Sequence, residues 1–375
     1  MIFGKKSKYP IGLDISDLSL KMVQLTQRRG KIKIQALSRR ALPKGLIEGG
    51  EIFNEAELIH EIEKLITKPM YGTVSSNEVV ACLPETKTFI KLIKIEANPN
   101  EISDIVEHEI QKHIPYSIDE VYFDWQIISK HQNESYVLVG AAPRKITDQY
   151  IRLLSNAKLS VQALEIEPVS ICRCLLMDES IKYNSKSLKN YAIIDIGAKR
   201  TSIVIYCQGT IVTSVSLPIS GQNTTEKIAK TLEISYEQAE KAKMVCGLDK
   251  QKAQGVIADI LGDKLKDLSG HIQDAISFFN NNYPEMGAIE EIFICGGGSS
   301  IKDLDRAMTE TLKIKTTRGN IFLNLDEASE KFSDILEEKH YIKNKKKTEV
   351  YCQTSIYAYA TTIGLALRNI FLKDE

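Results

Sequence analysis

The sequence predicts a mixed α/β protein built from two lobes, and three observations lead to that fold class. Apolar strand-like runs alternate with amphipathic helical stretches along the whole chain. The 375 residues are enough for two or three domains at about 150 residues each. Segments 11–21 and 192–202 repeat one pattern about half a chain apart, which indicates that each lobe begins with the same supersecondary unit.

The first lobe is expected to open with strands and one helix. Residues 11–38 predict three short strands, the last of which alternates apolar and polar side chains. Residues 55–67 place apolar side chains on one helical face, and the continuous apolar run at 78–83 suits a buried strand.

A separate unit follows, with the predicted order β-α-β-β-α-β. Its expected elements are a strand at 87–95, a helix at 101–113, a hairpin formed by 121–129 and 135–142, a helix at 145–158 and a strand at 160–166. This order over roughly 80 residues indicates a small unit inserted into a larger domain.

The second lobe is expected after a polar linker at 179–190, the candidate domain boundary. The other predicted elements are a helix at 168–178, three strands after residue 190, helices at 224–246 and 255–282, a strand at 291–295, a charged solvated loop at 327–350, and an apolar closing helix at 354–371.

Composition excludes several classes of function. Lys and Arg together number 49, as do Asp and Glu, so a broadly basic nucleic-acid binder is disfavoured. No apolar run is long enough to span a membrane, and the N-terminus has no apolar signal region. The seven cysteines are odd in number and widely spaced, which argues against a disulfide framework or zinc site and favours the cytoplasm.

The repeated unit is a strand that ends in Asp, a tight turn, and a second strand entered through Ser or Thr. Such a turn points backbone N–H groups at phosphate oxygens, and Asp14 and Asp195 are placed to hold Mg²⁺ through water. Two facing units would hold a triphosphate from both sides. The phosphate-binding candidates are Asp14, Ser16, Asp17, Ser19 and Lys21 in the first unit, and Asp195, Gly197, Ala198 and Thr201 in the second.

A third motif, IFICGGGSS, runs from a buried strand into three glycines. Gly296, Gly297, Gly298 and Ser299 are candidates for the nucleoside, because bare glycine lets a flat base lie against backbone. A helix is expected to start at Ser299-Ser300 with Asp303 in a capping box.

Glu240 and Lys243 lie one turn apart on a predicted helix, and two interpretations stay open. They are either an exposed ion pair or the groups that contact ribose and adenine or phosphate.

These motifs, in this order, resemble those of the actin-like ATPase superfamily, which has a ribonuclease H-like two-lobed fold. LEIEPVSICR (164–173) and TTIGLALRN (361–369) are similar to its two connecting helices. Within it the chain resembles the PilM family of type IV pilus assembly, on the start MIFGKKSKYPIGLDIS, on NPNEISDIVEHEIQKHIPYSIDEVYFDW (98–125) and on VLVGAAPRKITDQYIRLL (137–154).

The resemblance implies a division of the chain into five parts. They are 1–84, the first part of lobe 1 (1A); 85–163, an inserted 1C subdomain of the FtsA and PilM type; 164–188, a return to lobe 1 and a linker; 189–353, lobe 2 (2A/2B); and 354–375, a C-terminal helix that returns to lobe 1.

The resemblance also implies ATP or ADP with Mg²⁺, and at most slow ATPase activity in which Asp195 orients a water. It implies binding of the cytoplasmic N-terminus of a PilN-type inner-membrane protein, with candidate groove residues on 101–113 and 79–83, and contacts to motor and platform proteins. Recruitment to the inner face of the membrane would then come from the partner, and self-association stays open.

One departure concerns the first turn, where the family usually has Gly and Ser at the positions of Ser16 and Asp17. A Cβ at Ser16 hinders close approach of backbone to phosphate, and Asp17 repels phosphate unless Mg²⁺ or Lys21 compensates. Two alternatives to the adaptor remain: a small-molecule kinase or ATPase on the same fold, and an FtsA-like or GspL-like membrane-associated scaffold.

Overall fold

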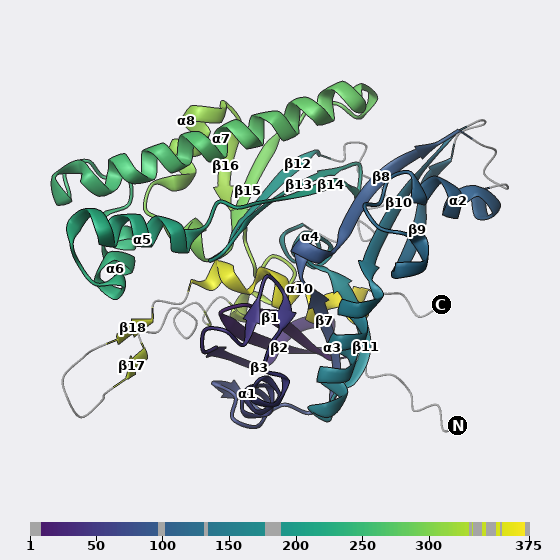
Figure 1. Cartoon of the computed structure of the whole chain (residues 1–375), viewed down its shortest axis with the longest axis horizontal. Helices are drawn as coiled ribbons and strands as arrows, with labels where there is room; N and C mark the ends of the chain where they lie inside the picture. The colour runs from purple at the N-terminus through teal and green to yellow at the C-terminus, as the bar shows by residue number, and fades with distance from the viewer. Residues whose placement is uncertain are drawn as a thin grey trace.

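Two large β-sheets, with helices between and outside them, form the main body of the described residues. The computed structural model describes residues 9–96, 102–130, 134–176, 189–329, 332, 340–342, 350–352 and 355–371 (Figure 1). Within these residues the predicted mixed α/β class is confirmed.

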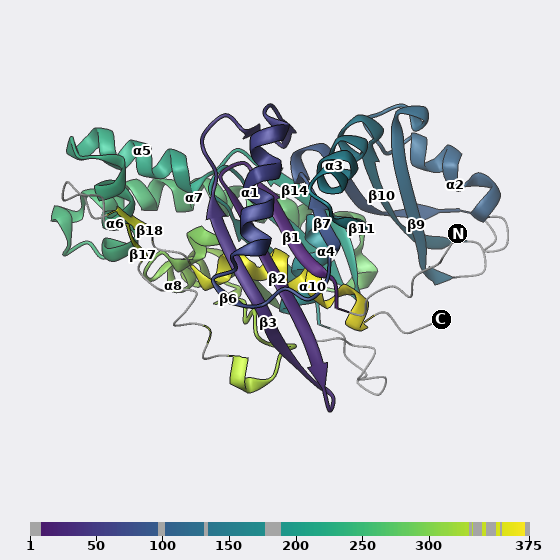
Figure 2. The same ribbon diagram turned by 90° about the horizontal axis from the view of Figure 1, so that it is seen from below.

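The first sheet has six strands, in the order β11-β7-β1-β2-β3-β6. These are β11 (Ser160–Ile166), β7 (Glu78–Leu83), β1 (Ile11–Ser16), β2 (Ser19–Arg28), β3 (Lys31–Ala41) and β6 (Tyr71–Gly72). Alternation along β1 sends Ile11, Leu13 and Ile15 into the core that α1 (Glu55–Thr67) and α3 (Arg144–Asn156) cover. Figure 2 shows α1 lying across the strands β1–β3.

The second sheet has eight strands, in the order β16-β15-β12-β13-β14-β8-β10-β9. These are β16 (Lys315–Arg318), β15 (Glu291–Cys295), β12 (Tyr191–Ile196), β13 (Thr201–Cys207), β14 (Thr210–Leu217), β8 (Phe89–Ile95), β10 (Ser135–Pro143) and β9 (Val121–Lys130).

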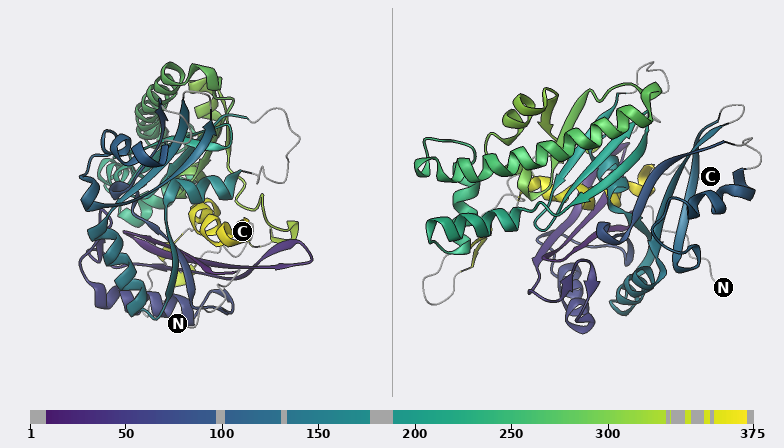
Figure 3. Two further views of the ribbon diagram at one scale, coloured as in Figure 1. Left: turned by 90° about the vertical axis from the view of Figure 1, so that its right-hand side faces the viewer. Right: turned by 45° about the horizontal axis from the view of Figure 1, so that its top comes forward.

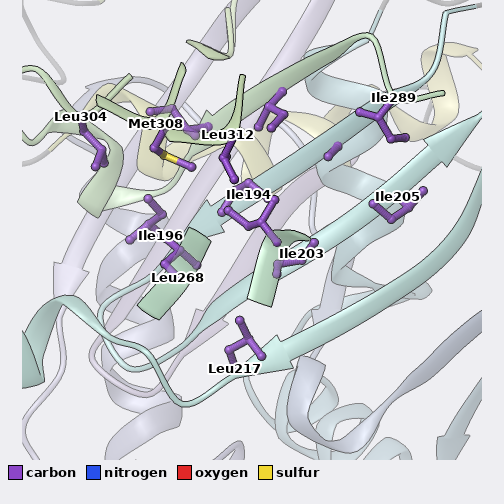
Figure 4. Close-up of a cluster of buried hydrophobic side chains, with 14 of the residues drawn as sticks. Ile194, Ile196, Ile203, Ile205, Leu217, Leu268, Ile289, Leu304, Met308 and Leu312 are labelled. Atoms are coloured by element: carbon purple, nitrogen blue, oxygen red, sulfur yellow. The ribbon is translucent and has the colours of Figure 1, made fainter. Parts of the chain in front are cut away.

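Helices α7 (Val256–Asn282) and α8 (Leu304–Leu312) cover the outer face of this second sheet. Helices α5 (Gly221–Leu232) and α6 (Tyr236–Cys246) pack on each other and on α7. In the core beneath them, Ile194 and Ile203 from the strands pack with Leu268 of α7 and Met308 of α8 (Figure 4). The long apolar stripe predicted for 255–282 is therefore a buried helix face.

Two helices lie between the sheets: α4 (Glu167–Leu175) and α10 (Ala360–Phe371) (Figure 3). They cross at Gly364, where a Cβ would come 1.8 Å from the carbonyl oxygen of Ser170. On the other side of α10, a Cβ at Gly12 would come 2.4 Å from the carbonyl oxygen of Thr362. The closing helix is thus a core element, as its apolar sequence predicts, and no helix of the described residues has the length and apolarity to cross a membrane.

The predicted β-α-β-β-α-β order between 87 and 166 is confirmed, with α2 (Ile102–Gln111) after β8. The unit is shared between both sheets, because β11 and α3 join the first lobe while β8 pairs with β14 at Lys91 and Thr213. The Tyr283 hydroxyl donates to the Leu92 carbonyl at 2.8 Å and the Tyr136 hydroxyl donates to Glu285, so β8 and β10 are fastened to the second lobe. The residue boundaries of the five expected subdomains stay a prediction.

Two local expectations are wrong. Residues Gly297–Ser300 form a single 3₁₀ turn and α8 starts only at Leu304, because the chain must first turn around Ile196, whose Cγ2 would lie 2.3 Å from a Cβ at Gly298. Asp303 precedes α8 at a φ of +62° and its side chain makes no capping bond.

The groove expectation fails at 79–83, since β7 lies between β1 and β11 with buried side chains. Most of the 179–190 linker and of the charged run at 327–350 lies outside the described residues; what is described there includes the short pair β17 (His340–Ile342) and β18 (Val350–Cys352).

Candidate functional site

A cavity of about 320 Å³ lies between the lobes, where the two repeated hairpins face one another. Ten of the predicted site residues line it: Asp14, Ser16, Asp17, Ser19, Lys21, Asp195, Gly197, Ala198, Gly296 and Gly297. Segments separated by about 180 residues in sequence are thus brought to one cleft, as the repeat predicts.

In the first hairpin, β1 and β2 run antiparallel and Asp14 lies opposite Lys21. The Lys21 ammonium donates to Asp14 Oδ2 at 2.6 Å, and both side chains are at most one-tenth exposed. From the neighbouring parallel strand β7, the Cys82 thiol donates to Asp14 Oδ1 at 3.7 Å. Lys21 therefore neutralises Asp14 and does not reach Asp17.

In the second hairpin, β12 and β13 place Ser202 opposite Asp195. The turn is closed by the Gly197 amide, which donates to the Arg200 carbonyl at 2.9 Å, and Arg200 is held against Ser216. Burial, together with the nearby Glu85 carboxylate, raises the pKa of Asp195 from 3.8 to about 7.

The glycine motif approaches the second aspartate closely. Gly296 has a φ of +78°, and a Cβ there would lie 2.1 Å from Asp195 Oδ1. The preceding residue, Cys295, lies opposite Asp195 on the parallel strand β15. Glycine is therefore required at 296 both for its backbone conformation and for the space that Asp195 occupies.

Sequence reasoning missed two carboxylates of the cavity, Glu85 and Glu167. Burial and the neighbouring Asp195 raise the pKa of Glu167 well above its ordinary value, and the Thr361 hydroxyl donates to Glu167 Oε1 at 3.0 Å. A usable signal was present for Glu167, which begins the connecting helix directly before Pro168, where a carboxylate faces the positive end of the helix dipole.

The unusual first turn directs its acidic side chain away from Lys21. Asp17 Oδ2 lies 2.9 Å from Lys199 Nζ on the opposite lobe. The amides of Gly49 and Gly50 donate to the same carboxylate at 2.8 and 3.0 Å. Of the two compensating cations named above, Lys21 is paired with Asp14 instead, and the side chain that compensates Asp17 is Lys199.

Ser16 takes part in the turn itself. Its hydroxyl donates to the carbonyl of Ser19 at 2.9 Å.

Five predicted residues do not line the cavity: Thr201, Glu240, Lys243, Gly298 and Ser299. Thr201 donates to the Ile219 carbonyl at 2.8 Å, and Ser299 donates to the Gly296 carbonyl at 2.8 Å.

Lys243 and Glu240 form the expected ion pair at 2.7 Å, but Lys243 is only 3% exposed and also donates to Thr225 and Gly221. Lys243 therefore holds α6 against the start of α5. Because its ammonium group is buried, the pair is expected to contribute more to stability than an exposed i,i+3 pair does.

Among the residues that the structure describes, no group of three or more His, Cys, Asp or Glu side chains is arranged to bind a metal directly. Asp14 and Asp195 both face the cavity, and one oxygen of Asp14 is held by Lys21. This donor set fits a hydrated Mg²⁺ held through water and a phosphate, and does not fit a cage made of protein ligands alone.

The sequence profile of the family described as type IV pilus assembly protein PilM matches residues 12–370. A solved "PilM-PilN type IV pilus biogenesis complex" contains a chain that superposes with a TM-score of 0.75 at 23% identity, over 96% of this chain and 98% of that one. MreB5 of Spiroplasma citri, solved with AMPPNP, superposes with a TM-score of 0.51 at 13% identity, over 88% and 97% of the two chains.

A curated relative, the cell division protein FtsA of Buchnera aphidicola subsp. Baizongia pistaciae (strain Bp), is 26% identical over 205 residues. That alignment covers 51% of this chain and 46% of the relative, so the chain spans about half of that protein's length. The two superpositions confirm the actin-like two-lobed fold.

Proposed function

The chain belongs to the family of the type IV pilus assembly protein PilM, and from that premise we propose that it is a nucleotide-binding adaptor of a pilus assembly platform. It binds ATP or ADP with Mg²⁺ between its lobes and docks the cytoplasmic N-terminus of a PilN-type inner-membrane protein. That partner holds it at the inner face of the membrane, next to the motor. The observation that carries the proposal is the cavity framed by both aspartate hairpins and Gly296-Gly297.

The cleft supplies what polyphosphate binding requires. Both turns and the glycine motif present backbone close to the cavity, and Lys199 and Arg200 supply positive charge there. Asp14 and Asp195 would hold the hydrated Mg²⁺, which offsets the negative charge of the phosphates. Asp195, with Glu167 beside it, would orient a water for slow hydrolysis.

A docking surface for the partner peptide is supported at the junction between α3 and β9. Three exposed apolar side chains gather around α3: Phe53, Tyr122 and Ile151. The Tyr122 hydroxyl donates to Asp148 of α3 at 3.2 Å, and the Ile52 carbonyl accepts from Gln149 of α3 at 3.2 Å. An extended peptide with apolar side chains would cover this surface, which joins the first lobe to the inserted strands.

The nucleotide half is tested with Gly297→Leu, because a Cβ at Gly297 meets nothing within 4 Å and the new side chain would project into the cleft. The matched control is Gly270→Leu on the exposed face of α7, where a Cβ also meets nothing. Titration of a fluorescent ATP analogue with Mg²⁺ should show at least tenfold weaker binding for Gly297→Leu alone. Equal binding by both variants would refute the placement of the nucleotide.

The partner half is tested with a synthetic peptide of the cytoplasmic N-terminus of a PilN-type protein from the same genome. Fluorescence anisotropy should show weaker binding for Ile151→Ser and Tyr122→Ser, and unchanged binding for Val245→Ser on α6, which is exposed to a similar degree. If the protein does not bind the peptide but phosphorylates small molecules, it is instead a kinase. If it binds lipid vesicles without a partner, it is a scaffold of the FtsA type.

A further inference from the structure

The Asp17–Lys199 contact joins two lobes that otherwise face each other across the cavity. Asp17 lies in the turn between β1 and β2, and Lys199 in the turn between β12 and β13. The Nζ–Oδ2 distance is 2.9 Å, the Asp17 side chain is 15% exposed, and both residues line the cavity. The ion pair is therefore placed where the phosphates of a nucleotide would pass.

The carboxylate is fixed by the first lobe. Its two amide donors, Gly49 and Gly50, form the tip of the short hairpin between β4 (Ile47–Glu48) and β5 (Glu51–Ile52). The Thr86 hydroxyl donates to the Gly49 carbonyl at 3.1 Å and the Tyr150 hydroxyl donates to the Gly50 carbonyl at 3.2 Å. A Cβ at Gly50 would lie 2.2 Å from Pro84, so the hairpin tip is closely packed.

Lys199 has no comparable fixation, because its side chain is 38% exposed at the tip of its turn. Two backbone amides and an ammonium group around one anion are the donors that proteins commonly offer to a phosphate. Here that anion is a side chain of the protein itself.

We propose that the Asp17–Lys199 ion pair, here called the clasp, holds the two lobes together across the cleft in the nucleotide-free protein. When a nucleotide binds, Lys199 leaves Asp17 and pairs with the polyphosphate chain. This rests on the proposed nucleotide site and adds a competition within it. The charge that an acidic residue brings to the first turn then sets how easily the cleft opens, rather than simply repelling phosphate.

The first test is a double-mutant cycle on the affinity for a fluorescent ATP analogue with Mg²⁺. Asp17→Asn keeps an oxygen for one of the two glycine amides but loses the charge that holds Lys199, so binding should tighten by about three- to tenfold. Lys199→Gln should weaken binding, because a phosphate ligand is lost. In the Lys199→Gln background the gain from Asp17→Asn should largely disappear.

Two outcomes of this cycle would overturn the clasp. Equal tightening by Asp17→Asn in both backgrounds would mean that the carboxylate only repels phosphate. Weaker binding by Asp17→Asn would mean that the carboxylate assists the nucleotide. Lys227→Gln, which removes a lysine of an exposed ion pair with Asp263 within the second lobe, is the control for loss of positive charge.

The second test needs no nucleotide, and it separates the clasp from the proposed function. In hydrogen–deuterium exchange, Asp17→Asn should speed exchange at 197–200 on the opposite lobe, and Lys199→Gln should speed exchange at 47–52. Exchange confined to the mutated lobe would overturn the clasp. Reciprocal changes in a protein that binds no nucleotide would refute the nucleotide site and keep the clasp as a lock between lobes.

Discussion

The two aspartate hairpins share one backbone design and differ in charge. Asp14 lies opposite Lys21 and is paired at 2.6 Å, whereas the equivalent partner of Asp195 is Ser202. Each aspartate also has a cysteine on the neighbouring parallel strand, Cys82 in the first lobe and Cys295 in the second. The two hairpins therefore share one backbone geometry, but the first neutralises its carboxylate with Lys21, whereas the second holds a half-buried carboxylate beside other acidic groups.

The largest effect is expected when the first hairpin loses its cation. Lys21→Met leaves Asp14 buried without its ammonium partner, so the free energy of unfolding should fall by about 3–5 kcal/mol in urea denaturation. Adding Asp14→Asn should recover much of that loss, because no buried charge then remains. A loss below about 1 kcal/mol would mean that the pair behaves as a solvated one.

For the second hairpin, the largest loss of stability is expected from a substitution at Gly296, which packs against Asp195. Gly296→Ala forces a left-handed backbone onto alanine and places its Cβ against Asp195, with an expected loss of about 2–4 kcal/mol. Gly297→Ala is the matched control, since its Cβ meets nothing within 4 Å, and it should stay within about 0.5 kcal/mol. Equal losses in thermal or urea unfolding would contradict the close packing at Gly296.

The raised pKa of Asp195 predicts that the stability of the protein depends on pH. Because the folded pKa of about 7 exceeds the unfolded value of 3.8, the folded protein holds the proton longer and loses stability as pH rises between these values. Relative to Asp195→Asn, the wild type should lose about 2 kcal/mol between pH 5 and pH 7, measured by urea unfolding in EDTA. Parallel curves for the two proteins would mean that Asp195 titrates normally.

The smallest effect is expected at the position that corresponds to Lys21 in the second hairpin. Ser202→Ala removes a neutral hydroxyl, so the free energy of unfolding should change by less than about 1 kcal/mol. A loss comparable to that of Lys21→Met would show that Ser202 secures Asp195 as Lys21 secures Asp14, and the contrast between the hairpins would disappear.

The sequence predicted the parts of the site that depend on local pattern. Strands, turns and glycines each have a local sequence signature. The repeat at Asp14 and Asp195 and the glycines after β15 can therefore be recognised from the sequence. The partners of Asp17 could not be predicted in this way, because Gly49 and Lys199 are 32 and 182 residues away and are brought to it only by packing of the lobes. Glu85 was missed for the same reason, since nothing around it in sequence distinguishes it from an exposed turn residue.

The fold was predicted to a similar degree. Element order followed from periodicity, whereas the pairing of β8 with β14 joins segments that the order of the chain assigns to different lobes. At Asp303 a local pattern was present but misled the prediction. The sequence predicted a capping box there, whereas in the structure the chain turns around Ile196 and the Asp303 side chain makes no capping bond.

The pairing of β8 with β14 also has a consequence for biosynthesis. Strand β14 leaves the ribosome about 120 residues after β8, which is roughly 6 to 24 s at the usual speed of translation. Throughout that interval the backbone donors and acceptors along one edge of β8 have no neighbouring strand to pair with. The nascent chain therefore carries an unpaired strand edge until its second half emerges.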